Sequence, residues 1–121
     1  MDSTFLLVGA LAAFIGVGFG AFGAHGLEGR LSPDMLATFE VGVRYQMYHA
    51  LAVLLVAVAA ARMNGTLVRV AGWLFTTGIV LFSGSLYVLT LSGITALGTV
   101  TPIGGVAFLA GWACLLVAAL R

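Results

Sequence analysis

The chain has 121 residues, of which 62% are hydrophobic and only 7% are charged, with a formal net charge of +1. This composition excludes an ordinary soluble domain, and the small net charge gives no reason to expect nucleic acid as a partner. Residues 70–120 contain no Asp, Glu, Lys, Arg or His, and such a run is long enough for two membrane crossings of ~20 residues each. We therefore predict an integral membrane protein. Apolar segments of this length satisfy their backbone hydrogen bonds in lipid as helices, so we predict an all-α fold.

The first membrane helix is expected over residues 4–24. Only Asp2 is charged before it, and its apolar core has the full spanning length, so we interpret it as a membrane helix and not as a cleaved signal peptide. Small residues recur along it every three or four positions, and this spacing lets two helix backbones approach closely in lipid. The glycines expected to pack in this way are Gly9, Gly16, Gly20 and Gly23.

The next helix is expected to begin at Ser32-Pro33-Asp34, which combines a capping hydroxyl, a proline at the first helical position and an acid in the first turn. A helix from there to Arg62 would be ~45 Å long, too long for one upright crossing. We therefore expect a short interfacial helix over 33–43, a bend near Gly42, and a spanning helix over 44–61.

The two sides of this helix differ in character. One side carries a stripe of large residues, namely Arg44, Tyr48, Leu51, Leu55, Val58 and Arg62. The other side carries smaller residues, namely Gly42, Tyr45, His49, Ala52 and Val56. We expect the second side to pack inward, because small side chains permit close helix contact.

The last two membrane helices are expected over 70–91 and 102–120, the second one beginning at Thr101-Pro102. Gly104 and Gly111 give this helix a small-residue stripe of its own. The sequence thus predicts a single transmembrane domain over 1–121, built as a bundle of four helices in two hairpins. We also expect the bundle to form oligomers, because its glycine stripes offer more close-packing surface than one small bundle needs.

Four crossings place both termini and the loop after Arg62 on one side of the membrane. That side carries three arginines and the other side two, so the positive-inside rule favours cytoplasmic termini in an inner (plasma) membrane.

Polar side chains gather in the other half of the bundle. The candidate functional residues are His25, Glu40, Arg44, Tyr45, His49, Ser83 and Tyr87. Glu40 and Arg44 are expected at the membrane rim as an ion pair one turn apart. The tyrosines are also typical of the membrane interface, and the serine of helix packing. His49 is expected to point into the bundle, where an ionisable group is costly and suggests function.

Four motifs resemble a known family. They are Gly-Ala-Phe-Gly-Ala-His-Gly-Leu (20–27), Phe-Glu-Val-Gly-Val-Arg-Tyr-Gln-Met-Tyr-His-Ala-Leu (39–51), Phe-Ser-Gly-Ser-Leu-Tyr (82–87) and Thr-Pro-Ile-Gly-Gly (101–105). They span most of the chain, show no departure from the family pattern, and resemble the small bacterial inner-membrane proteins of the YgdD/YwdK type. The resemblance implies a multi-span helical membrane protein. It implies no activity and identifies no catalytic residue.

Three functions remain open from the sequence. The first, which we favour, is a non-enzymatic accessory or structural subunit that associates with itself or with a larger membrane complex and contacts membrane lipids. The second is a small proton or solute pore or carrier with a polar half-channel around His49. The third is a metal or haem site between His25 and His49, although two histidines are fewer ligands than zinc usually takes, and we predict no cofactor.

Overall fold

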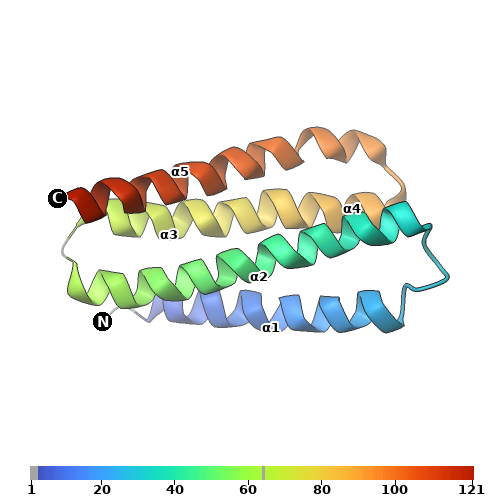
Figure 1. Ribbon diagram of the computed structural model, residues 1–121, viewed down its shortest axis with the longest axis horizontal. Helices are drawn as coiled ribbons and strands as arrows, with labels where there is room; N and C mark the ends of the chain where they lie inside the picture. The colour runs from blue at the N-terminus through green and yellow to red at the C-terminus, as the bar shows by residue number, and fades with distance from the viewer. Residues whose placement is uncertain (1–2, 64) are drawn as a thin grey trace.

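The computed structural model describes residues 3–63 and 65–121 of the chain, and the regular structure in this part is entirely helical. The long helices lie roughly parallel in an elongated bundle (Figure 1). The helices are α1 (Thr4–His25), α2 (Pro33–Arg62), α3 (Thr66–Gly78), the π-helical turn η1 (Ile79–Ser83), α4 (Gly84–Ser92), the 3-10 turn η2 (Thr95–Thr99) and α5 (Thr101–Leu120).

Within the described residues, four segments are long and apolar enough to cross a membrane. They are Thr4–His25, Pro33–Arg62, Thr66–Ser92 and Thr95–Leu120. The prediction of an all-α integral membrane protein with four spanning helices is therefore confirmed. Both described ends of the chain lie at the same end of the bundle as the connection between α2 and α3 (Figure 1).

The expected interfacial helix over 33–43 is not a separate element, because α2 runs without a break from Pro33 to Arg62. The helix begins as the sequence indicated: Ser32 caps it, with its side-chain oxygen accepting a hydrogen bond from the Met35 amide at 3.2 Å. The first turns of α2 stay in line with the rest because they are packed within the bundle. Phe39 is only 1% exposed and lies between α1 and Tyr87 of α4.

The third span begins at Thr66, four residues earlier than expected, so Arg69 lies in the helix and not in a loop. Its middle is interrupted by the π-helical turn η1, which the sequence did not predict. Such turns insert one extra residue into an α-helix and are frequent at functional sites. In this chain the turn coincides with close contacts to both α2 and α5, described below.

α2 and the α3–η1–α4 span form the centre of the bundle, while α1 and α5 lie on its outside. α1 packs mainly on α2, and α5 packs mainly on α3 and η1. In the most apolar stretch of each span, 44% of the residues of α2 are buried but only 17% of those of α1 and of α5. The outer helices therefore present most of their surface to lipid or to other proteins.

Glycines allow the close approach of these helices. A Cβ atom on Gly16 of α1 would lie 2.6 Å from the Met47 sulfur of α2, and one on Gly111 of α5 would lie 2.6 Å from the Phe75 ring of α3. A Cβ on Gly9 or Gly104 would likewise lie closer than 3.0 Å to a neighbouring atom. One on Gly23 would make a tight contact of 3.0 Å with the Phe39 ring, whereas one on Gly20 would lie at an ordinary 3.4 Å from Val43. Because these glycines pack within the chain, they do not by themselves require a second copy.

Candidate functional site

Gln46 joins three helices in the middle of the bundle. Its side chain, 4% exposed, extends from α2. Its Nε2 donates to the Ala12 carbonyl of α1 at 2.7 Å, and its Oε1 accepts the hydroxyl proton of Tyr87 of α4 at 2.6 Å. In lipid an amide without such partners would lose its hydrogen bonds. Gln46 therefore fixes both the spacing and the register of the three helices.

Two serines beside the π-helical turn bind the neighbouring helices. Ser83, fully buried, donates to the Gly42 carbonyl of α2 at 2.6 Å. Ser85 and Thr101 of α5 share a hydrogen bond of 2.6 Å between their hydroxyls. The turn thus places one hydroxyl toward α2 and another toward α5, only two residues apart.

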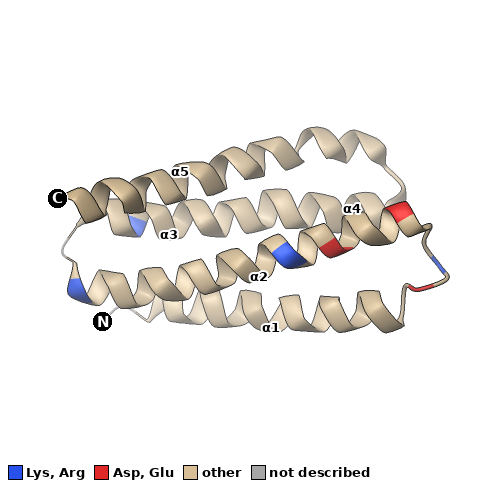
Figure 2. Ribbon diagram, in the orientation of Figure 1, with Lys and Arg blue, Asp and Glu red and all other residues tan. Residues whose placement is uncertain are grey.

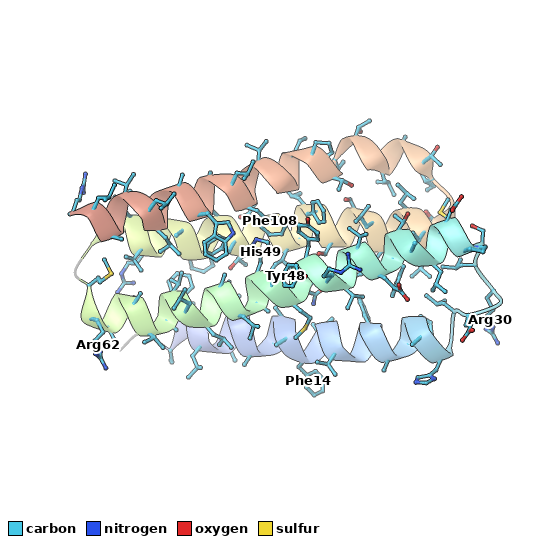
Figure 3. All side chains as sticks on the ribbon, in the orientation of Figure 1. Phe14, Arg30, Tyr48, His49, Arg62 and Phe108 are labelled. Atoms are coloured by element: carbon cyan, nitrogen blue, oxygen red, sulfur yellow. The ribbon has the colours of Figure 1, made fainter. Side chains whose placement is uncertain are left out.

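His49 points from α2 toward α5 and lies beside Phe108 (Figure 3). Its ring stacks on that of Phe108, with centroids 3.6 Å apart and an interplanar angle of 9°. Its Nδ1 lies 2.8 Å from the Tyr45 carbonyl, which can only accept, so this nitrogen carries the proton. Nε2 is then the acceptor for the indole N–H of Trp112 at 3.1 Å. This network assigns a neutral ring whose two nitrogens both have partners.

The structure separates the remaining predicted residues from this network. Glu40 and Arg44 lie on the exposed side of α2 as expected, but the described part of the chain contains no ion pair between them. In Figure 2, α2 carries acidic and basic positions along one half and a further basic position at its opposite end, whereas the ribbons of α1 and α5 carry none. Tyr45 remains 37% exposed at the edge of the inward side, where its ring contacts Phe82.

His25 and His49 do not share a site. His25 is exposed at the end of α1. The nearby Gly23 faces Phe39 of α2, whose ring lies 3.0 Å from a Cβ placed on that glycine, so His25 lies near the level of Phe39. His49 is ten residues further along α2, or ~15 Å. Both nitrogens of His49 already have protein partners, and among the described residues no three His, Cys, Asp or Glu side chains converge as metal ligands would. The geometry therefore does not fit a ligand pair formed by these two rings.

Sequence reasoning did not select three residues that organise this site: Gln46, Phe108 and Trp112. The signal for Gln46 was present, since an amide in a spanning helix needs partners within the protein. Trp112 and Phe108 gave no such signal, because aromatic residues are ordinary in membrane helices. Only the tertiary structure, in which these two rings reach from α5 to α2, reveals that they enclose His49.

A cavity of about 190 Å³ lies between α1, α2 and the third span. Its lining is Val8, Leu11, Ala12, Ile15, Gln46, Thr76, Ile79 and Val80. The walls are almost entirely apolar, and neither His49 nor Ser83 nor Tyr87 contributes to them. This cavity therefore does not provide the polar half-channel that the sequence suggested around His49.

Every buried polar side chain in the described residues has a hydrogen-bond partner. The bonds of Gln46, Ser83, Ser85 and His49 each connect different helices. Bonds of this kind between helices are typical of helix association in lipid.

Comparison with known proteins gives one family. Residues 19–105 match the family described as "Protein of unknown function (DUF423)". The UPF0382 membrane protein YwdK of Bacillus subtilis is 50% identical over 118 residues, which cover 97% of this chain and 96% of that protein. A UPF0382 membrane protein of Staphylococcus aureus is also 50% identical, over 97% of this chain and 95% of its own length. One from Staphylococcus haemolyticus is 47% identical over the same shares. No solved structure matches. The resemblance drawn from the four motifs is confirmed, and the chain belongs to the DUF423 family of multi-pass membrane proteins.

Proposed function

We propose that this protein is a non-enzymatic structural or accessory subunit that assembles within the membrane, with itself or with a larger complex. One observation carries the proposal. The buried side chains of Gln46, Ser83, Ser85 and His49 are bonded to other helices of the same chain, and no buried side-chain nitrogen or oxygen is left without a partner among the described residues. Such a network stabilises a bundle and offers no reactive group to a substrate.

His49 illustrates this use of polar groups. A proton carrier or metal ligand needs at least one ring nitrogen that is free to bind its cargo. Both nitrogens of this ring are bonded, and the stacked Phe108 covers one of its faces. The geometry therefore supports a role in joining α2 to α5 over a role in transport or ligation.

The outer surface supports assembly. Large apolar side chains project from the helices without internal contacts, among them Phe14 on α1 (79% exposed) and Leu109 on α5 (71% exposed). Figure 3 shows Phe14 extending away from the bundle. Helices of this kind lie against lipid or against other membrane helices, and a chain whose function is assembly needs such a surface.

We further propose an inner (plasma) membrane location with both termini in the cytoplasm. Arg62, Arg69 and Arg121 lie at the end of the bundle that holds the termini, and positive charge near spanning helices favours the cytoplasmic side. A reporter fused after Arg121 tests this: fluorescence of a green fluorescent protein supports it, and activity of an alkaline phosphatase at the same position refutes it.

The test of function is recovery of the assembly. Tagged protein is extracted from its native membrane in mild detergent, and its molar mass is measured by light scattering, alone and after exchange into lipid nanodiscs. We expect a mass above that of the 12.4-kDa monomer, or a stoichiometric membrane partner. A monomer without a partner in both media refutes the proposal. Proton or solute flux in proteoliposomes that is lost in His49→Ala would replace it with the transport function.

A further inference from the structure

The exposed side of α2 carries a row of residues with the spacing of a helix-pairing surface. This row, here called the α2 seam, consists of Arg44, Tyr48, Leu51, Leu55, Val58 and Arg62. Its steps of four, three, four, three and four residues follow the heptad a and d positions at which two helices interlock. All six residues are exposed, and the four apolar or aromatic ones are each more than half exposed. Tyr48 lies midway along α2 and Arg62 at its end (Figure 3).

Two unpaired charges lie at the other end of the seam. Arg44 is a basic side chain, and the acidic Glu40 lies one turn before it on the same helix. Two residues four positions apart on one helix have the spacing at which ion pairs form. In the described part of the chain, however, Glu40 and Arg44 do not form an ion pair with each other. Both charged groups are therefore available to an external partner.

The depth of Arg44 favours such a partner. The neighbouring residue Val43 lies 3.4 Å from a Cβ placed on Gly20 of α1, so Arg44 is close to the level of Gly20 along the bundle. Gly20 is five residues before the end of α1 at His25, which places this level ~8 Å inside the end of that helix. The 22 residues of α1 are ~33 Å long, close to the ~30 Å of a hydrocarbon core. Arg44 therefore leaves α2 near the inner edge of the headgroup layer, where an unpaired charge is costly.

We propose that the chain forms a symmetric dimer through the α2 seam, in which Glu40 of each copy pairs with Arg44 of the other. This inference rests on the proposed function in assembly and names both the partner and the surface. Copies inserted in the same orientation are related by a twofold axis along the membrane normal, so any pair between residues 40 and 44 occurs twice. The apolar residues of the seam pack below the two ion pairs. Arg62 lies at the opposite, water-facing end, where salt screens its repulsion.

Charge reversal with co-expression tests the pairing. Glu40→Arg and Arg44→Glu are made separately, with different tags, and the molar mass of each is measured in nanodiscs. We expect each variant alone to dissociate at least tenfold more readily than the wild type. Co-expressed, the two variants place arginine opposite glutamate at both contacts and should recover a heterodimer. A pair formed within one chain would not be rescued in this way, because each variant then carries two like charges on its own helix.

Cysteine cross-linking provides a second measurement that does not depend on the charged variants. In a Cys114→Ser background, Leu51→Cys should form a disulfide-linked dimer in membranes. Leu109→Cys, on the exposed side of α5, is the matched control and should not.

The outcomes separate this inference from the proposed function. Cross-linking through Leu109→Cys but not Leu51→Cys overturns the α2 seam and leaves assembly intact. A wild-type monomer without a partner overturns both proposals. A wild-type monomer that loses bound anionic phospholipid on Arg44→Glu would show that a lipid phosphate, and not Glu40 of a second copy, neutralises the arginine.

Discussion

Replacing Gly104 with alanine tests how closely α5 approaches the π-helical turn. A Cβ atom at this position would lie 2.4 Å from the backbone nitrogen and 2.8 Å from the Cα of Phe82. Ordinary contacts begin at 3.4 Å, so α5 would have to move by about 1 Å, and no flexible side chain can yield in its place. Overpacking of this kind typically costs about 1–3 kcal/mol. The upper part of that range applies here, because the opposing atoms are backbone.

The adjacent Gly105 is the matched control. The nearest atom to a Cβ there is the Phe82 ring at 4.0 Å, so Gly105→Ala meets no obstruction. Both substitutions gain the same helix propensity, about 1 kcal/mol in water, which cancels in the comparison. We expect Gly104→Ala to be less stable than Gly105→Ala by about 2 kcal/mol in reversible unfolding with sodium dodecyl sulfate in mixed micelles. Equal stabilities would refute the close contact between α5 and η1.

Three further predictions concern the polar network. Tyr87→Phe leaves the Gln46 carbonyl oxygen without its donor and should lower the free energy of unfolding by about 1 kcal/mol. The double variant of Tyr87→Phe with Gln46→Leu should lose less stability than the sum of the two single variants. Additive losses would contradict the hydrogen bond. His49→Phe preserves stacking on Phe108 but removes the acceptor of the Trp112 indole N–H. In a chain whose other tryptophan is replaced by phenylalanine, the fluorescence emission of Trp112 should therefore shift to the blue. An unchanged emission spectrum would argue against the hydrogen bond. Protein purified gently from its membrane should show no Soret band and no stoichiometric metal in elemental analysis, since the two histidines lie far apart; a metal that disappears in His25→Ala would overturn this prediction.

The polar groups of this chain show how location in lipid changes the meaning of a side chain. A glutamine or serine in water exchanges one hydrogen-bond partner for another at little net gain. In the bilayer the alternative partner is absent, so hydroxyls and amides bond across helices, with contributions of about 0.6 kcal/mol on average and up to ~2 kcal/mol. Helix packing thus explains Ser83, Tyr87 and His49 in the cluster that the sequence placed in one half of the membrane, whereas His25, Glu40 and Arg44 lie exposed outside this network.

Several features followed from the sequence alone because they depend on local chemistry. The number of spans follows from the length and polarity of each segment, and the start of α2 follows from the capping hydroxyl of Ser32 and the ring of Pro33. The inward side of α2 was also predicted from residue size, and His49 is buried there. The exposed stripe that begins at Arg44 is the other side of the same helical periodicity.

Only the tertiary structure decided how these elements are used. The continuity of α2 through residues 33–43 depends on Phe39 packing between α1 and α4, and the π-helical turn coincides with the contact of Ser83 with Gly42 and of Phe82 with Gly104. The bond between Trp112 and His49 joins residues 63 positions apart. Local patterns dictate which segments become helices and which side faces inward. Hydrogen bonds and close contacts between helices depend on their spacing and rotation, and these exist only once the four helices are packed together.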